Sequence, residues 1–269
     1  MLPVREDALS ARLIEKAGYP ASFMTGYGLA ATKGYPDTGL VSYKEVLDIV
    51  QGIASVTTIP VIADADTGYG NPMNLKRTVS GFAQAMVGGI MIEDQVFPKR
   101  CGHTKGKAIV SREEAFARIR AAVDARKESG IDIFIMARTD ARGTDSLDEA
   151  IYRCQKFHEL GADMTFLEAP RSLEEMERLC KEIPGFKCCN VVEGGLTPVL
   201  PTPALAKLGY VVAIHPVTIF SAAIKAMSDM LEAMKDDTAE GIEKTKESIL
   251  DFKDLSRVVG FDDYYKEEG

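Results

Sequence analysis

The sequence predicts an α/β fold: a closed (β/α)8 TIM-type barrel in one domain, residues 1–269. Short apolar runs rich in β-branched residues recur about every 25 to 35 residues, and an amphipathic stretch follows most of them. These runs are continuously apolar instead of alternating, which is typical of parallel strands buried on both faces. The length of 269 residues is also close to what eight strand–helix units need to close a barrel.

Eight segments are expected to form the strands of the barrel. They are residues 1–4, 21–26, 60–64, 89–94, 132–139, 164–169, 187–193 and 210–216. Helices are expected between them, among them residues 42–56, 111–129, 146–160 and 172–183. Three of these begin at Ser111, Ser146 and Ser172 and place Glu three positions later, which is the capping-box pattern. No G-x-G-x-x-G pattern follows the first strand, so an open dinucleotide-binding sheet is disfavoured.

The segment after the eighth strand is expected to be helical over residues 219–235 and 239–258, with a polar tail at 260–269. Residues from about 236 to 269 are therefore expected to form a C-terminal helical extension of the barrel. A helix that the barrel does not need is free to pack on another subunit. The Met-rich stretch 227–234 is expected to be helix core or a subunit contact.

Composition and charge exclude several classes of protein. Apolar residues make up 46% of the chain and charged residues 27%, which argues for a globular protein and against disorder. The net charge of −8 disfavours a nucleic-acid or anionic-membrane partner. No apolar run reaches the roughly 18 residues of a membrane-spanning helix, and no signal-peptide core is visible, so the cytoplasm is the expected location. Five cysteines, an odd number, predict reduced thiols.

Polar residues close most of the expected strands. Because the carboxyl ends of all strands in such a barrel meet at the rim that holds the active site, these side chains are candidates for function. They are Asp64 and Asp66, Glu93 and Asp94, Arg138 and Asp140, Glu168, Asn190 and Glu193. The acids Asp64, Asp66 and Glu93 would supply hard oxygen ligands that suit Mg2+, and without a cation they would repel each other. The alternative is that they are helix caps or surface acids.

The segment Lys99-Arg-Cys-Gly-His103, called the KRCGH loop below, follows the fourth strand by a few residues. Two cations, with His103 as a third, are expected to lower the pKa of the Cys101 thiol and to supply a proton donor or acceptor. Gly102 and Gly106 would let this loop open and close. The alternative is a solvated basic loop with an exposed cysteine.

Several motifs together resemble the isocitrate lyase and phosphoenolpyruvate mutase superfamily, in its methylisocitrate lyase or dimethylmalate lyase branch. They run in the family's order through nearly the whole chain. They are D-A-L-S-A from Asp7, T-G-Y-G from Thr25, P-D-T-G from Pro36, D-A-D-T-G-Y-G from Asp64, I-E-D-Q from Ile92, the KRCGH loop, A-R-T-D from Ala137 and F-L-E-A from Phe166. The resemblance implies a homotetramer that exchanges a terminal helix between subunits.

The resemblance also implies the residues of a magnesium site, in which Mn2+ is expected to substitute. Asp64 would ligate the ion directly or through water, while Asp66, Glu93 and Asp37 would hold its outer waters. Residues expected to bind the substrate are Thr25, Gly26 and Tyr27, whose amides would hold a carboxylate, together with Arg138, Glu168, Asn190 and Pro216. Residues expected to take part in catalysis are Cys101, which would protonate an enolate, with Lys99, Arg100, His103 and Arg138.

The implied activity is Mg2+-dependent cleavage of a hydroxy di- or tricarboxylate of the alkylmalate or methylisocitrate type, giving a 2-oxo acid and a second carboxylate. Three alternatives stay open. Phosphonopyruvate hydrolase or phosphoenolpyruvate mutase chemistry is disfavoured by the KRCGH loop, and oxaloacetate hydrolysis by Pro216, where hydrolytic relatives tend to have Ser. An inactive metal-binding scaffold is disfavoured because every ligand position is filled. Phe23 stands where the lyases often have Tyr, so the base that deprotonates the substrate is not assigned.

Overall fold

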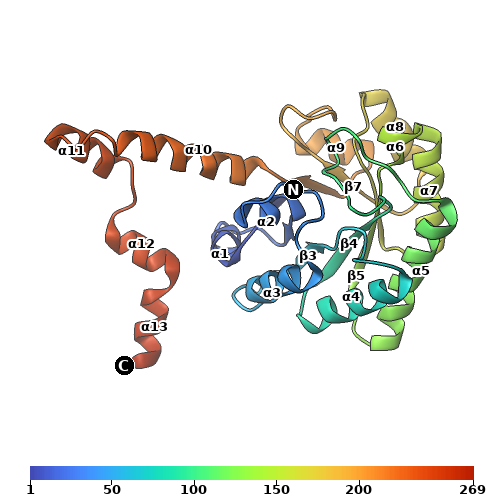
Figure 1. Ribbon diagram of the computed structural model, residues 1–269, viewed down its shortest axis with the longest axis horizontal. Coiled ribbons are helices and arrows are strands. Elements are labelled where there is room, and N and C mark those ends of the chain that lie inside the picture. Colours follow the sequence, from blue (N-terminus) through green and yellow to red (C-terminus); the bar gives the residue numbers. More distant parts are fainter. The chain divides into compact units, whose positions relative to one another are not determined.

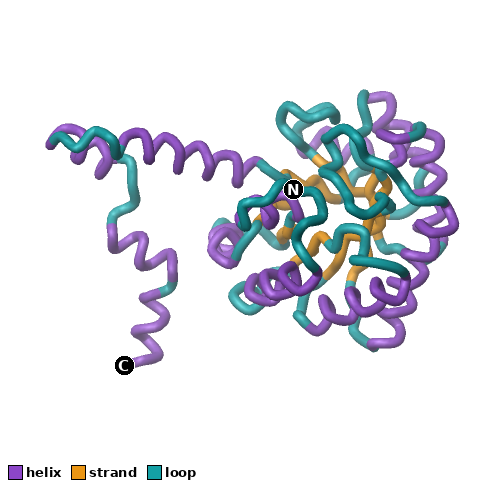
Figure 2. Tube along the Cα trace, viewed as in Figure 1, coloured by secondary structure: helices purple, strands orange, loops and turns teal.

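A computed structural model describes residues 1–269, and its eight strands close into a parallel barrel surrounded by helices (Figures 1 and 2). Each strand pairs with the next along the chain, and β1 pairs with β8. The strands are β1 Leu2–Arg5, β2 Ser22–Met24, β3 Val61–Asp64, β4 Gly89–Glu93, β5 Phe134–Thr139, β6 Met164–Leu167, β7 Phe186–Asn190 and β8 Val212–His215. The expected (β/α)8 barrel is confirmed, with all eight strands at the expected places.

The helices of the barrel alternate with the strands. They are α1 Ala8–Lys16, α2 Gly26–Thr32, α3 Tyr43–Ala54, α4 Pro72–Gln84, α5 Arg112–Ser129, α6 Ala141–Thr144, α7 Leu147–Glu159, α8 Leu173–Glu182 and α9 Thr202–Leu208. Four more follow the last strand: α10 Thr218–Ala233, α11 Ala239–Glu247, α12 Phe252–Val259 and α13 Phe261–Glu268. None of the helices is both long and apolar enough to cross a membrane.

The chain divides into two compact units, Met1–Thr218 and Ile219–Gly269. The boundary lies earlier than the expected start of the extension near residue 236, because α10 belongs almost entirely to the second unit. The helix expected over 239–258 is two helices, since α11 ends at Glu247 and Asp251 caps α12. The expected polar tail is helix α13, which starts after Gly260 in a left-handed conformation and has Asp262 and Asp263 in its first turn.

Most strands are shorter at their carboxyl ends than the sequence suggested. The expected strand 187–193 ends at Asn190, and the expected strand 164–169 ends at Leu167. The polar residues just beyond leave the strand ladder, and Ala169 adopts a positive φ of 55°. The ladder therefore ends at the rim, where Asp64, Glu93 and Asn190 are the last strand residues and Glu168 lies just beyond its strand.

Two kinds of core hold the barrel together. One cluster, to which nearly every strand contributes, fills the barrel interior with the buried residues Val4, Phe23, Met91, Met136, Met164, Phe166, Cys188 and Ile214. Two larger clusters lie between the strands and the surrounding helices. Burying large side chains on both faces accounts for the continuously apolar strands.

The predicted N-cap serines are present, but the second hydrogen bond of the capping box, from the N-cap backbone N–H to the N3 glutamate side chain, is not. Ser111, Ser146 and Ser172 each accept a hydrogen bond from the backbone N–H three residues later. The glutamates at those positions bind arginines instead: Glu149 pairs with Arg112 and Arg153, and Glu175 with Arg142. These ion pairs tie neighbouring segments together, a role that the local capping pattern does not reveal.

Candidate active site

The carboxyl ends of the strands bring the predicted polar residues to one rim of the barrel. Asp64, Glu93 and Asn190 are the last residues of β3, β4 and β7. Arg138 is the next-to-last residue of β5, and Glu168 directly follows β6. Since all strands are parallel, these side chains share one end of the barrel.

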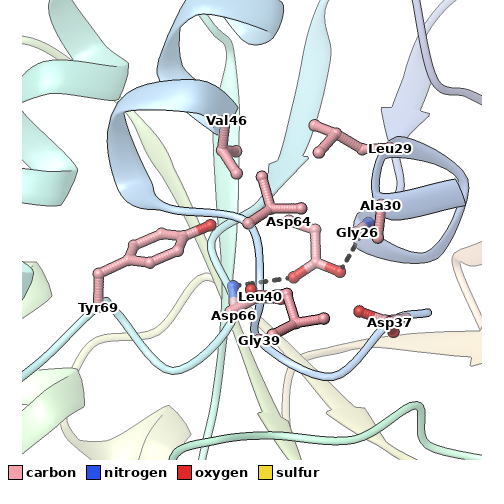
Figure 3. A pocket seen from close by; sticks show the side chains of 11 residues that line it. Gly26, Leu29, Ala30, Asp37, Gly39, Leu40, Val46, Asp64, Asp66 and Tyr69 are labelled. Atoms are coloured by element: carbon pink, nitrogen blue, oxygen red, sulfur yellow. Dashed lines mark hydrogen bonds between the residues drawn. The ribbon is translucent and has the colours of Figure 1, made fainter. Parts of the chain in front are cut away.

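A cluster of acids lies on the β3 side of the rim (Figure 3). Asp64 is fixed by two backbone amides: its Oδ1 accepts from Asp66 N at 3.0 Å and its Oδ2 from Gly26 N at 3.2 Å. Asp66 has a left-handed φ of 49°, which turns the chain back toward Asp64. With Asp37, these residues line a cavity of about 10 Å³, which has room for about one water molecule.

Lys99 of the KRCGH loop reaches into this acid cluster. Its Nζ lies 2.5 Å from Asp37 Oδ1 and 2.8 Å from Asp66 Oδ1, and its side chain is 4% exposed. The contact with Asp66 is an ion pair without hydrogen-bond geometry, so Asp66 Oδ1 has no hydrogen-bond donor. Glu93 Oε1 is likewise buried without a partner. One buried ammonium therefore pairs with two acids and leaves Glu93 Oε1 without a partner.

The acid cluster is under electrostatic strain. Burial raises the pKa of Asp66 to about 6; Lys99 opposes this rise, and the carboxylates of Asp64 and Asp37 add to it. Burial also raises the pKa of Glu93 well above its usual range, against the charge of Arg138. More negative charge is gathered here than Lys99 can balance, which is the environment that a hard divalent cation prefers.

The predicted magnesium ligands fit such an ion through water better than as a closed cage. No group of three acid, histidine or cysteine side chains converges closely enough to hold one ion. Magnesium usually keeps several waters and binds only one or two carboxylates, so this spacing suits it. Asp64, oriented by two amides, is the best placed for direct contact. Asp66 Oδ1, which Lys99 contacts, and Glu93 Oε1, which has no partner, can accept from metal-bound waters.

A second cluster, centred on Arg138, lies on the β5–β7 side of the rim. Its guanidinium binds Asp140 through Nε at 2.9 Å and a second nitrogen at 3.1 Å. Nε is also 3.3 Å from Glu93 and 3.6 Å from Glu168. Burial acts to lower the pKa of Arg138, but these three acids raise it well above its usual value. Arg138 is therefore a fixed cation beside the acid cluster.

His103 links the KRCGH loop to this second cluster. Its Nε2 is 2.8 Å from Glu168 Oε1, and its Nδ1 accepts the N–H of Leu196 at 3.2 Å. Because Nδ1 accepts, the ring proton lies on Nε2 and points at Glu168. Asn190 Nδ2 also donates to Glu168, at 3.3 Å. Although burial acts in the other direction, Arg138 and His103 lower the pKa of Glu168, which stays an anion.

The expectation that flanking cations lower the pKa of Cys101 is wrong. Burial raises the pKa of this half-buried thiol, despite an N–H donated by His103. The cations are occupied elsewhere: Lys99 binds acids, and Arg100 donates to Lys105 O at 3.3 Å. Cys101 remains close enough to Asp37, Glu168 and Arg138 for their charges to act on it. The Cys101 thiol therefore lies within reach of the charges of both clusters.

The glycines of the loop have different roles. A Cβ on Gly102 would lie 2.5 Å from an Arg138 nitrogen and 2.7 Å from the Glu168 carboxyl carbon, so only glycine allows this close approach. Gly106 has a left-handed φ of 80°, and a Cβ there would meet Arg100. Beside the loop lies an opening of about 390 Å³, whose walls include Tyr27, Tyr35 and Cys101. A small organic acid has room to reach the thiol from this side.

Not every predicted site residue joins these clusters. The amides expected to hold a carboxylate are engaged within the chain: Thr25 N donates to Arg5 O, Gly26 N to Asp64 and Tyr27 N to Thr25 Oγ1. Pro216 is half-buried directly after β8, and Arg100 turns away over Gly106. Phe23 lies in the barrel interior, 3% exposed.

Two residues of the site had been given no catalytic or binding role: Asp140 was noted only as a polar residue of the rim, and Lys107 was not noted. Asp140, fully buried, accepts from Arg138 and also from Lys107 Nζ at 2.7 Å, and together these cations lower its pKa to about 2 against the effect of burial. The position of Asp140, two residues after Arg138, was the feature of the sequence that could have indicated this ion pair. For Lys107 the sequence contained no signal, because only the path of the loop brings it to Asp140.

Comparison with known proteins agrees with this geometry. A family model described as phosphoenolpyruvate phosphomutase matches residues 1–235. The chain is 46% identical over 255 residues to 2,3-dimethylmalate lyase from Eubacterium barkeri, covering 94% of this chain and 88% of the relative. The crystal structure of a 2,3-dimethylmalate lyase matches with a TM-score of 0.92 and 36% identity, over 98% of this chain and 88% of that one.

Enzymes of other activities are similar as well. Oxaloacetate acetylhydrolase in complex with 3,3-difluorooxalacetate matches with a TM-score of 0.91 and 32% identity, over 99% of this chain and 90% of that one. A phosphonopyruvate hydrolase with bound oxalate and Mg2+ matches with a TM-score of 0.86 and 26% identity, over 99% and 92%. From the family model, the identity to curated relatives and the shared barrel, we conclude that the chain belongs to the phosphoenolpyruvate mutase/isocitrate lyase superfamily.

Proposed function

We propose that this protein is a Mg2+-dependent carbon–carbon lyase that cleaves an alkylmalate- or methylisocitrate-type hydroxy acid into a 2-oxo acid and a second carboxylate. The observation that supports this most is the place of Cys101, whose thiol lines the same opening as Asp37 and lies within reach of the charges of Glu168 and Arg138. A lyase needs such a donor, because the carbon that leaves must receive a proton. The similarity to 2,3-dimethylmalate lyase supports the same activity.

The metal would be held by Asp64 directly and by Asp66, Glu93 and Asp37 through waters, and Mn2+ would substitute for Mg2+. When bound, the ion supplies Lewis acidity toward the oxygens of the 2-oxo acid and offsets the crowded carboxylates. The chain's own contribution is to orient the Asp64 carboxylate through two backbone amides. Lys99, which pairs with Asp37 and Asp66, would adjust as the ion and substrate enter.

The remaining residues act on the organic acid itself. Arg138, cationic and held by Asp140, would bind oxygens on which negative charge develops. Glu168 and Asn190 would form the far wall, where His103 closes the loop over the substrate. The substrate hydroxyl would first lose its proton to a base, and the bond to the adjacent carbon would break to give the 2-oxo acid and the enediolate of the second carboxylate. Cys101 Sγ would then give its proton to the α-carbon of that enediolate. The raised thiol pKa suits this role, because the thiol stays protonated at neutral pH.

Ligand-dependent thermal stability tests the proposed site. Oxalate imitates a 2-oxo acid bound at a metal, so Mg2+ and oxalate together should raise the melting temperature by more than the sum of their separate effects. The measurement is thermal unfolding with each ligand, both, and both plus excess EDTA. An oxalate effect of equal size without divalent metal would contradict a metal-dependent site.

Oxaloacetate hydrolysis is the second candidate, because oxaloacetate acetylhydrolase is similar over nearly the whole chain. Pro216, directly after β8, stands against it, since we expect Ser at this position in the hydrolases. The thiol also favours cleavage with carbon protonation over phosphonate chemistry, which requires no such donor.

We further propose that the protein is a homotetramer that exchanges a terminal helix. The helices of the second unit expose many apolar side chains, and no residue of α10 is buried. They include Met227, Leu231, Phe252, Leu255 and Tyr264, with Phe252 82% exposed. Exposed apolar surface of this kind marks a protein interface. Light scattering at micromolar concentration should give the mass of four chains, and a monomer would contradict the proposal.

A further inference from the structure

The backbone on both sides of Cys101 is held by buried side chains. Gln95, 1% exposed, donates from Nε2 to Arg100 O at 2.8 Å and accepts from Arg100 N at 2.9 Å. One amide side chain thus binds both backbone groups of the residue before the cysteine. On the other side, Lys107 Nζ donates to Gly102 O and pairs with Asp140. The cysteine lies between two fixed points.

Gln95 itself is firmly anchored to the barrel. Arg118, 5% exposed, donates from one guanidinium nitrogen to Gln95 O at 2.8 Å and to Glu93 O at 3.1 Å. Gln95 also forms an isolated antiparallel bridge with Ile109. The Gln95 side chain therefore transmits the position of the β4 end, where Glu93 lies, to the backbone of Arg100.

We propose that Gln95 is the positioning residue that fixes the Cys101 thiol over the rim. Gly102 has no side chain of its own to hold the backbone next to the cysteine, so hydrogen bonds from Gln95 and Lys107 hold it. The importance of this position for turnover rests on the proposed function, in which Cys101 donates a proton. A displacement of about 1 Å at a reacting group can cost about 10²-fold in rate.

The variant Gln95→Met tests this, because Met has a similar volume and makes neither hydrogen bond. Alkylation of Cys101 by iodoacetamide, followed by mass spectrometry of its peptide, should become about tenfold faster, since losing both bonds eases opening of the loop. If the proposed function holds, kcat should fall about 10- to 100-fold while KM changes much less. The matched control is Gln155→Met, which removes an exposed glutamine bond to Glu182 O and should change neither rate.

A second variant covers the case in which Gln95→Met does not fold. Gln95→Glu keeps an acceptor for Arg100 N–H and removes the donor to Arg100 O, so its alkylation rate should lie between those of wild type and the Met variant. A folded Gln95→Met protein with wild-type alkylation would overturn the positioning role. Faster alkylation with unchanged lyase turnover would support that role and count against Cys101 as the proton donor, so the two proposals fail separately.

Discussion

Replacing Cys101 with Ser is expected to lower carbon–carbon cleavage on the order of 10²-fold or more, the scale typical of a general acid. The fold and the binding of Mg2+ and oxalate should persist, because Ser keeps the size and a hydrogen-bond donor. An alcohol gives up its proton far less readily than a thiol, whose ordinary pKa is roughly 8.5. The structure agrees with this expectation, since burial raises the pKa of the thiol and Cys101 lines the same opening as Asp37.

The measurement for Cys101 is kcat with 2,3-dimethylmalate and Mg2+ for wild type and Cys101→Ser, with the melting temperature in Mg2+ and oxalate as a check of the site. Cys180→Ser is the matched control, because this half-buried cysteine on α8 lies outside both clusters. Equal cleavage rates in wild type and Cys101→Ser would remove the thiol from the mechanism and reopen the phosphonate activities.

Replacing Asp64 with Ala should nearly abolish turnover, the second large effect. Asp64 is the acid that two backbone amides orient, so its loss leaves a gap in the oxygen shell that water fills only partly. Mg2+ affinity should fall with it. The same substitution should also change Asp66 in the metal-free protein. The charge of Asp64 helps to raise the pKa of Asp66, so this pKa should be lower in Asp64→Ala.

Isothermal titration of Mg2+ in the presence of oxalate measures the loss of affinity in Asp64→Ala. The control is Asp48→Ala, which removes an exposed acid of α3 that pairs with Lys44. Full activity of Asp64→Ala at low millimolar Mg2+ would show that the metal binds elsewhere.

The residues of the rim could be predicted because position in the sequence determines their location. A polar residue at the carboxyl end of a barrel strand lies at the active-site rim, so Asp64, Glu93 and Arg138 could be predicted from the strand pattern. The order of the motifs gave the family and placed Asp37 and the KRCGH loop.

The contacts of the loop could not be predicted in the same way. Adjacent charges suggested that Arg100 acts on Cys101, whereas the folded loop directs Arg100 to Lys105 O. Lys107 and Gln95 bind backbone oxygens of the loop, and these contacts depend on its path through space. For the same reason the direction of the Cys101 pKa was wrong: burial, which the local sequence does not encode, outweighs neighbouring charge.

Product analysis tests the central claim most directly. Purified protein with Mg2+ is incubated in D2O with 2,3-dimethylmalate, 2-methylisocitrate, oxaloacetate or phosphonopyruvate, and products are followed by NMR. The proposed lyase should release pyruvate from at least one hydroxy acid, with one deuterium on the α-carbon of the second carboxylate, and EDTA should stop the reaction. Oxalate and acetate from oxaloacetate alone, or phosphate from phosphonopyruvate alone, would contradict it.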